Sequence, residues 1–129
     1  MSGRLADKVV FITGAASGIG RATADAVRAE GGVVAAADLT PPEGLGNRDI
    51  ALRLDVTDRT AMADAVNHIM KHYGRLDGLV TCAGISVAGT VTHFSLEEWD
   101  RALAVNLTGT MLAARAVIPH MVAAGSGSI

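Results

Sequence analysis

Residues 13–20 read Thr13-Gly14-Ala15-Ala16-Ser17-Gly18-Ile19-Gly20, a glycine-rich stretch between two segments of different periodicity. Residues 8–13, KVVFIT, are mostly apolar and β-branched, which is typical of a strand buried on both faces. From Ile19 to Val27, apolar or small residues recur at helical spacing, and Gly31-Gly32 ends that pattern. The stretch therefore predicts a tight connection from a buried strand into a helix.

Each glycine of this connection has its own expected role. Gly14 permits a tight turn, the missing side chain at Gly18 lets a pyrophosphate approach the backbone, and Gly20 lets the helix pack closely. The helix N-terminus offers N–H groups and the positive end of its dipole to an anion. No Lys-Ser or Lys-Thr follows the glycines, which favours a dinucleotide over ATP as the ligand.

The rest of the chain alternates strand and helix patterns. Apolar runs predict strands over residues 33–38, 50–56 and 79–82, with a loop that lacks a helix between the first two. Thr57 is placed to cap a helix whose apolar stripe runs from Met62 to Tyr73, and Gly74 is placed to end it. Short apolar strands that alternate with helices predict an α/β fold with a parallel sheet and right-handed crossovers.

A further long helix is expected to begin at the capping box Ser95-Leu96-Glu97-Glu98. Pro119 is expected to kink or shorten its last turn. The Gly-Ser-Gly-Ser sequence that follows signals a turn, and Ile129 looks like the first residue of another strand. The apolar face of this helix is expected to form core and dimer surface rather than a ligand groove, and it comprises Leu103, Leu107, Met111, Ala114, Ile118 and Val122.

Composition bounds the class of protein. The 129 residues suit one domain, half of them are apolar, and the net charge of −2 gives no case for nucleic acid or an anionic membrane. The single cysteine, Cys82, excludes an intrachain disulfide and fits a reducing compartment. We find no N-terminal apolar signal and no run near the roughly 18 apolar residues of a membrane span. We therefore expect a cytoplasmic chain without nucleic-acid or membrane partners.

Asp38 ends the predicted strand 33–38 and indicates which dinucleotide is bound. A carboxylate at this place can accept hydrogen bonds from both ribose hydroxyls of an adenosine and would repel a 2′-phosphate. Neither Ser17 nor Leu39 supplies a positive charge for such a phosphate. The pattern favours NAD over NADP, and the alternative is that Asp38 merely caps a loop.

Taken together, these residues resemble the short-chain dehydrogenase/reductase family over the whole chain. The family's cofactor fingerprint is similar to Gly14-x-x-x-Gly18-Ile19-Gly20, and its adenine-contacting pair to Asp55-Val56. Further similarities lie in Ala83-Gly84, Asn106 and the segment Gly127-Ser128-Ile129, which resembles the start of the fifth strand. The resemblance implies a Rossmann-like, doubly wound parallel sheet in three layers (α/β/α), with strand order 3-2-1-4-5-6-7. It also implies that residues 1–129 are one NAD(P)-binding domain, interrupted at the start of strand five.

The resemblance further implies a cofactor site and a partner surface. Asn106 would anchor a water that relays protons to a catalytic lysine, no metal is used, and the helix around residues 103–122 would pair across a homo-oligomer interface. The implied cofactor-binding residues are Gly14, Ser17, Gly18, Ile19 and Gly20 at the pyrophosphate, Asp38 and Leu39 at the ribose, Asp55 and Val56 at the adenine, and Cys82, Ala83 and Gly84 along the groove.

The sequence departs from the family at its catalytic groups. The family uses a serine and a Tyr-x-x-x-Lys pair, whereas the only tyrosine here, Tyr73, is followed four residues later by Asp77. Ser126 and Ser128 come too early for the family's serine, and Thr81-Cys82 replaces an Asn-Asn pair. We therefore expect the cofactor-binding part of an NAD-dependent oxidoreductase acting on an alcohol or ketone, which alone binds cofactor without catalysing hydride transfer.

Alternatives remain at the level of the sequence. The chain can also be a non-catalytic dinucleotide-binding module or a dimerisation partner, and a Rossmann-like methyltransferase is a more distant alternative. Cys82 lacks an evident histidine partner and is expected to be a buried, inert thiol. His68 and His72 have the spacing of zinc-binding helices without a third ligand, and we expect them on an exposed polar face.

Overall fold

A computed structural model describes residues 2–129 and has a parallel sheet at its centre. Its strands lie in the order β3-β2-β1-β4, as the first four strands of a doubly wound sheet do. The parallel register pairs Val10 with Val34 on one side of the central strand and with Gly78 on the other. The described strands are β1 (Val9–Thr13), β2 (Val33–Asp38), β3 (Ile50–Arg53) and β4 (Gly78–Thr81).

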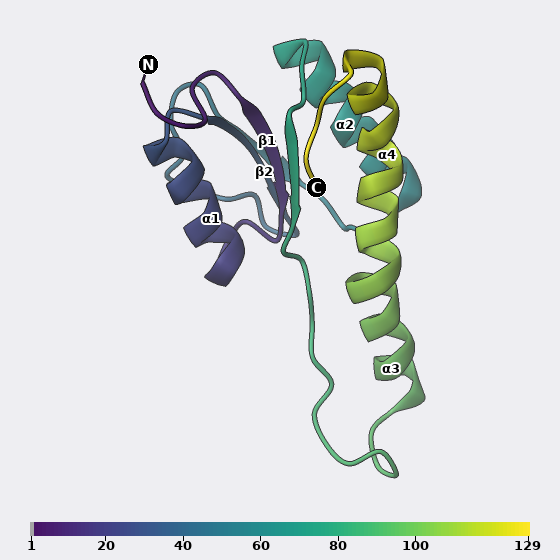
Figure 1. The fold of residues 1–129 in the computed structure, drawn as a ribbon. Helices are drawn as coiled ribbons and strands as arrows, with labels where there is room; N and C mark the ends of the chain where they lie inside the picture. The colour runs from purple at the N-terminus through teal and green to yellow at the C-terminus, as the bar shows by residue number, and fades with distance from the viewer. Residues whose placement is uncertain (1) are drawn as a thin grey trace.

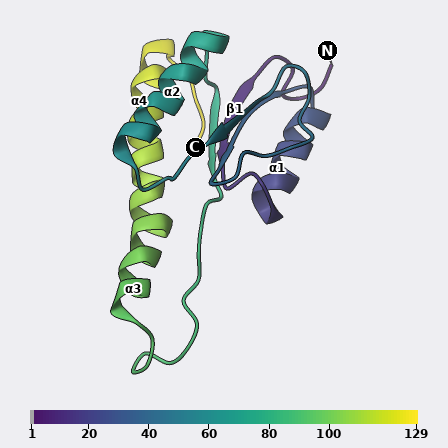
Figure 2. The ribbon, with the colours of Figure 1, turned by 180° about the vertical axis from the view of Figure 1, so that it is seen from behind.

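Helices cover both faces of the sheet and give the predicted three layers. Helix α1 (Gly18–Ala29) lies on one face, and α2 (Arg59–Tyr73) and α4 (Gly109–Ala124) lie on the other (Figure 1). Helix α3 (Leu96–Leu103) runs into α4 through a π-helical turn, η1 (Ala104–Thr108), so that one long rod extends below the sheet. The view from behind shows the same separation of α1 from the α2–α4 side (Figure 2).

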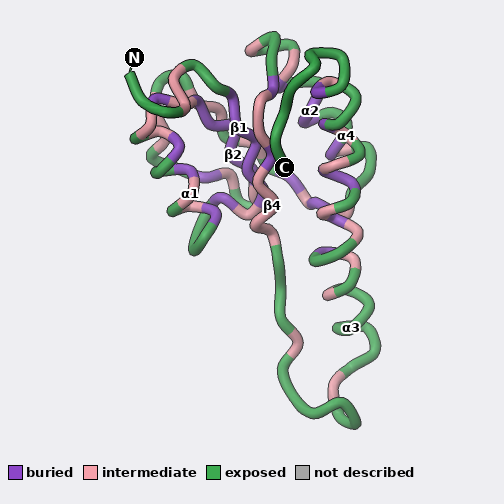
Figure 3. The backbone as a smooth tube through the Cα atoms, viewed as in Figure 1, coloured by how far each residue is buried: buried purple, intermediate pink, exposed green. Residues whose placement is uncertain are grey.

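The alternating side chains of the strands form two separate cores. Phe11 and Leu79 belong to the larger core under α2 and α4, whereas Ile12 and Val34 belong to the smaller one under α1. Buried residues follow the sheet and the inner sides of the helices, while α3 and the loop before it are largely exposed (Figure 3). Because β1 is buried along its whole length, the prediction of a strand covered on both faces is confirmed.

Several element boundaries differ from the sequence predictions. Asp58 rather than Thr57 caps α2, because the Asp58 carboxylate accepts the Ala61 N–H at 3.0 Å. Strand β3 stops at Arg53 instead of continuing to residue 56. Helix α4 passes Pro119 and reaches Ala124, so the expected shortening of its last turn is wrong. The left-handed Gly74 at the end of α2 and the Ser95 cap of α3 are as predicted.

The apolar face of the long helix is exposed rather than part of the core. Five of its six members, Leu103, Leu107, Met111, Ile118 and Val122, are exposed, with Leu107 at 66% and Val122 at 74%. The opposite side of the rod enters the core instead. The expectation that this face contributes to the core is therefore wrong. The expectation that it forms a dimer surface stays a prediction. The buried side of the rod consists of Val105, Gly109, Leu112, Ala113, Val117 and Met121.

The helical segment Leu96–Ala124 is 29 residues long, and by length and composition it is apolar enough to cross a membrane. The expectation that no stretch approaches such a span is therefore wrong on this measure. One such helix is weak support for a membrane location, since a core helix of a globular protein passes the same test. In this structure 33% of its most apolar stretch is buried inside the protein.

Residues 126–129 lie along the outer edge of β4. The Leu79 N–H donates to the Ser128 carbonyl at 2.9 Å, and the Ser128 N–H donates to the Asp77 carbonyl at 3.1 Å. This parallel bridge between Gly78 and Ser128 is what the first contact of a further strand looks like. The strand expected at Ile129 thus begins to pair one residue earlier.

Two carboxylates fasten the amino ends of the strands. Asp49, just before β3, accepts the Val34 N–H of β2 at 2.8 Å. Asp77, just before β4, accepts the Val9 N–H of β1 at 2.8 Å. Burial alone would raise the pKa of Asp77, but the Arg75 guanidinium and the Val9 N–H hold that pKa below its ordinary value. Each carboxylate therefore connects its own strand to the neighbouring one.

Candidate functional site

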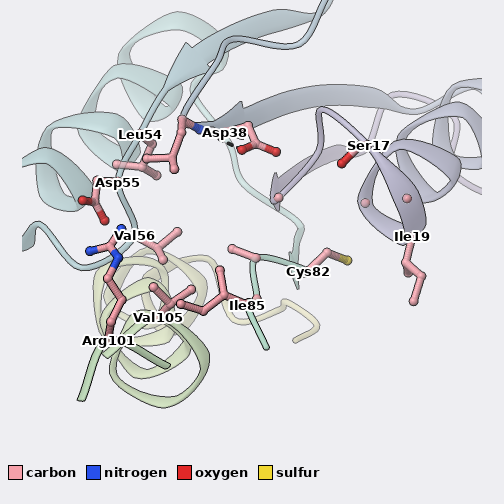
Figure 4. A pocket seen from close by; sticks show the side chains of 16 residues that line it. Ser17, Ile19, Asp38, Leu54, Asp55, Val56, Cys82, Ile85, Arg101 and Val105 are labelled. Atoms are coloured by element: carbon pink, nitrogen blue, oxygen red, sulfur yellow. Dashed lines mark hydrogen bonds between the residues drawn. The ribbon is translucent and has the colours of Figure 1, made fainter. Parts of the chain in front are cut away.

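A pocket of about 350 Å³ opens at the carboxyl ends of β1, β2 and β4, beside the N-terminus of α1 (Figure 4). In an open α/β sheet this edge is where ligands bind. All twelve residues predicted to bind the cofactor line this one pocket, whereas Asn106 does not. The lining residues that the sequence analysis missed are Leu54, Ile85, Arg101 and Val105.

The glycine loop forms the wall of the pocket next to α1. Gly18 has a φ of +57°, and a Cβ placed on it would meet nothing within 4 Å. The space there is open for a ligand to approach the backbone. A Cβ on Gly20 would instead collide with the Gly14 carbonyl, so Gly20 is needed for the close return of the helix over the loop. The close packing at Gly20 is as predicted from the glycine spacing, and the pyrophosphate role of Gly18 stays a prediction.

The N-terminus of α1 is suited to an anion. Ser17 is extended, its side chain does not cap the helix, and no acidic residue stands in the first turn. The first N–H groups of α1 therefore remain available to a ligand beside the exposed side chain of Ile19. This arrangement fits a pyrophosphate without further positive charge.

Asp38 lies at the end of β2, next to the glycine loop. One of its carboxylate oxygens accepts the Ala16 N–H at 3.0 Å and the other accepts the Leu39 N–H at 2.8 Å. Asp38 therefore does fasten a loop, which was the alternative interpretation of its place in the sequence. Each carboxylate oxygen has a second lone pair, so both can still accept a ligand hydroxyl from the pocket.

Asp55 and Val56 form the far end of the pocket. Asp55 accepts both the hydroxyl of Thr57 at 2.7 Å and its N–H at 3.0 Å. These two bonds hold the pKa of Asp55 below its ordinary value against the opposing effect of burial, and the positive charge of Arg101 acts in the same direction. The Asp55 carboxylate is thus kept ionised as a hydrogen-bond acceptor.

Arg101 and Val105 enter the same end of the pocket from the long helix. They are four residues apart, so they lie on one helix face, and in Figure 4 both side chains reach toward Val56. The spacing of four residues can be read from the sequence and places both side chains on one face of the helix. Nothing in the sequence indicated, however, that this face would meet the end of β3.

Cys82 and Ala83 continue the groove past the end of β4. The Cys82 N–H donates to the Thr13 carbonyl at 3.1 Å, and the Ala83 N–H donates to the Thr13 hydroxyl at 3.4 Å. Thr13 thus ties the two strand ends together, although Thr81-Cys82 replaces the Asn-Asn pair. The Cys82 side chain is half-buried and lines the pocket, so the expectation of a buried thiol is wrong.

Asn106 lies in the π-helical turn, and both ends of its amide are engaged. Its Nδ2 donates to the Ile85 carbonyl at 2.8 Å, and its Oδ1 accepts the Ile85 N–H at 2.8 Å. The amide therefore satisfies the backbone of the segment that follows β4. The water-anchoring role expected of Asn106 stays a prediction.

The remaining candidate residues lie away from the pocket. Tyr73, the only tyrosine, donates its hydroxyl to the Arg48 carbonyl at 2.6 Å, and burial raises the pKa of Tyr73 to about 12. His68 and His72 are exposed on α2, as predicted. Within residues 2–129, no group of three or more His, Cys, Asp or Glu side chains is placed to hold a metal ion.

Comparison with known proteins assigns a family to this architecture. A family model described as short chain dehydrogenase matches residues 8–129. The trans-4-hydroxycyclohexanecarboxylate dehydrogenase of Sinomonas cyclohexanicum is 40% identical over 100% of this chain and 55% of its own length. A 3-alpha-(or 20-beta)-hydroxysteroid dehydrogenase of Mycobacterium tuberculosis is 41% identical over 100% of this chain and 52% of its own length.

A solved structure shows the same arrangement of elements. The ligand-free aldohexose dehydrogenase of Thermoplasma acidophilum superposes with a TM-score of 0.87 at 36% identity. The match covers 95% of this chain and 48% of that protein. The chain thus spans about half the length of the relatives it matches.

Proposed function

The chain belongs to the short chain dehydrogenase family, and we propose that it is the NAD-binding part of an oxidoreductase that acts on an alcohol or ketone. Supporting this proposal, the named relatives are dehydrogenases of hydroxylated compounds and of a sugar. The observation that carries it is the pocket in which the open helix N-terminus and Asp38 face one another. The single cysteine and the family's fold favour a cytoplasmic location.

The residues of the pocket fit an adenosine-containing dinucleotide. The backbone at Gly18 and the first N–H groups of α1 would hold the pyrophosphate, and Asp38 with Leu39 would hold the ribose. Asp55 and Val56 would contact the adenine, and Cys82, Ala83 and Gly84 would guide the nicotinamide half along the end of β4. The nicotinamide, when bound, supplies the acceptor or donor of a hydride.

What these residues contribute to such a reaction is binding and orientation. Asp38 would accept hydroxyls, the helix N-terminus would compensate negative charge, and Ile19 and Val105 would offer apolar contacts along the walls of the pocket. None of the pocket residues is a tyrosine or a lysine. We therefore propose that residues 1–129 by themselves bind the cofactor without catalysing hydride transfer.

Cys82 offers a direct test of NAD binding that does not depend on catalysis. It is the only thiol and it lines the pocket, so a bound dinucleotide should slow its reaction with a maleimide. We expect NAD to slow the labelling in a saturable way, with the Kd given by titration. Labelling that NAD leaves unchanged, together with no heat of binding, would contradict the proposed function.

Replacing Asp38 should change the cofactor preference. Asp38→Ala removes the ribose acceptor, so we expect the Kd for NAD to rise by roughly tenfold. The same variant no longer repels a 2′-phosphate, and the ratio of NADP to NAD affinity should rise. Isothermal titration with both dinucleotides measures the two effects, and Asp38→Asn serves as the isosteric control. An unchanged NAD affinity would contradict the assignment of Asp38 as the residue that binds the ribose.

The exposed face of the rod favours a second role as a dimerisation module. Five large apolar side chains lie along it, and such a continuous patch marks an interaction surface. We propose that the chain pairs with another copy of itself through this face. This role does not depend on whether the chain takes part in catalysis.

Leu107→Glu should abolish this pairing, because it would place a charge within the apolar face. Sedimentation velocity should show a dimer for the wild type and a monomer for the variant. Ala26→Glu, exposed on α1 at the other face of the sheet, is the control and should stay dimeric. A monomeric wild type at high concentration would contradict the proposed interface.

A further inference from the structure

One cationic side chain lines the pocket, and it comes from the long helix rather than from the sheet. Arg101 lies in the last turn of α3, and it is the only Lys or Arg among the described residues that line the pocket. Figure 4 shows its side chain rising from the helix toward Asp55, with the guanidinium beside the carboxylate and Val56. A positive charge therefore stands at the end of the pocket opposite α1.

The Arg101 guanidinium is not committed to a protein partner. Among residues 2–129, the side chain of Arg101 takes part in none of the hydrogen bonds and ion pairs found. Asp55 beside it is held through one oxygen by Thr57, which leaves its other oxygen available. The end of the pocket thus presents a carboxylate acceptor and a guanidinium donor side by side.

The helix that carries Arg101 is fixed against the sheet at two points. Asn106 exchanges two hydrogen bonds of 2.8 Å with the backbone of Ile85. Gly109 packs so closely on Val56 that a Cβ on it would lie 2.6 Å from the Val56 Cγ2 atom. These contacts hold the helix directly after Arg101 beside the ends of β3 and β4.

The order of groups along the pocket determines which part of the ligand would reach Arg101. The N-terminus of α1 takes the pyrophosphate and Asp38 the ribose, so the base extends past Asp38 toward Asp55 and Arg101. Adenine carries an amino donor beside ring nitrogens that accept hydrogen bonds. This pattern complements a carboxylate next to a guanidinium.

We propose that Arg101 binds the adenine ring of the dinucleotide, with its guanidinium donating to an acceptor nitrogen while the Asp55 carboxylate accepts the amino group. The inference rests on the proposed function, because it adds a residue to the same site. Arg101 thereby makes the long helix the third wall of the adenine pocket, facing the ends of β2 and β3. It acts in binding and touches no reacting atom.

Arg101→Ala tests the assignment by titration calorimetry. We expect the Kd for NAD to rise by about three- to tenfold, as the loss of one exposed hydrogen bond implies. ADP-ribose, which keeps the adenine and lacks the nicotinamide, should lose affinity by the same factor. Arg101→Lys keeps the charge without the planar fork and should recover only part of the affinity. Arg115→Ala, on the same rod but away from the pocket, should bind as the wild type does.

The salt dependence separates direct contact from general attraction. At about 0.5 M NaCl, where long-range attraction between charges is screened, the ratio of variant to wild-type Kd should persist. A ratio that falls to one at this salt, or an ADP-ribose affinity that does not change, would overturn the contact with adenine. If the wild type binds NAD and Arg101→Ala binds it equally well, the Arg101 assignment alone fails. If the wild type does not bind NAD, the proposed function fails with it.

Discussion

Gly18→Ala should weaken NAD binding by roughly thirtyfold, or about 2 kcal/mol, because the new methyl group occupies space that the pyrophosphate needs. Gly18 has a φ of +57° and open space where a Cβ would stand. The variant should also lose about 1–2 kcal/mol of unfolding free energy, since an alanine is strained in the left-handed region. Calorimetric titration with NAD and urea unfolding measure the two effects separately.

Gly74 provides a matched control for this substitution. It too has a positive φ, +72°, and a methyl group on it would meet nothing within 4 Å, but it ends α2 away from the pocket. Gly74→Ala should therefore cost a similar amount of stability and leave NAD affinity unchanged. If both variants bind NAD equally well, the pyrophosphate does not approach the backbone at Gly18, and that part of the site is wrong.

Asp49→Ala should lower the free energy of unfolding by about 2–4 kcal/mol, because it leaves a buried N–H and a guanidinium without their acceptor. The Asp49 side chain is only 4% exposed, and its carboxylate forms an ion pair with the Arg28 Nε atom at 3.0 Å. It also accepts the N–H groups of Val34 at 2.8 Å and Gly46 at 2.7 Å. Urea unfolding of the wild type and the variant measures the difference.

Asp64→Ala is the control, because Asp64 is an exposed carboxylate on α2. Its stability should stay within about 0.5 kcal/mol of the wild type. Asp49→Asn, which keeps an acceptor oxygen without the charge, should fall between the two. A variant at position 49 as stable as Asp64→Ala would mean that this carboxylate does not hold β2 and β3 together.

The fold could be predicted where one local pattern determined the structure. Residues 8–13 and 33–38 are apolar throughout most of their length, which a strand covered on both faces explains, and the glycines between them require a turn into a helix. The same patterns brought Gly18, Asp38 and Asp55 to one edge, because the carboxyl ends of parallel strands meet there. Those parts of the sheet and of the pocket follow from the order of elements along the chain.

Other features depended on contacts between distant segments. The face from Leu103 to Val122 has the apolar spacing of a core helix, yet the opposite face is buried, because Gly109 allows a close approach to Val56. The π-helical turn around Asn106 shifts the helix phase, and sequence periodicity does not contain that shift. Arg101 was missed for the same reason, since its place in the pocket depends on how the rod meets the sheet.

The carboxylates that fasten the strands and the pocket that receives the ligand lie at opposite edges of the sheet. Asp49 and Asp77 act at the amino ends of the strands, whereas Asp38 stands at a carboxyl end. Mutations that accumulate around Asp38 would therefore leave the other two carboxylates and their partners untouched. Over many generations, one edge can diversify in what it recognises while the other preserves the fold inherited from an ancestor.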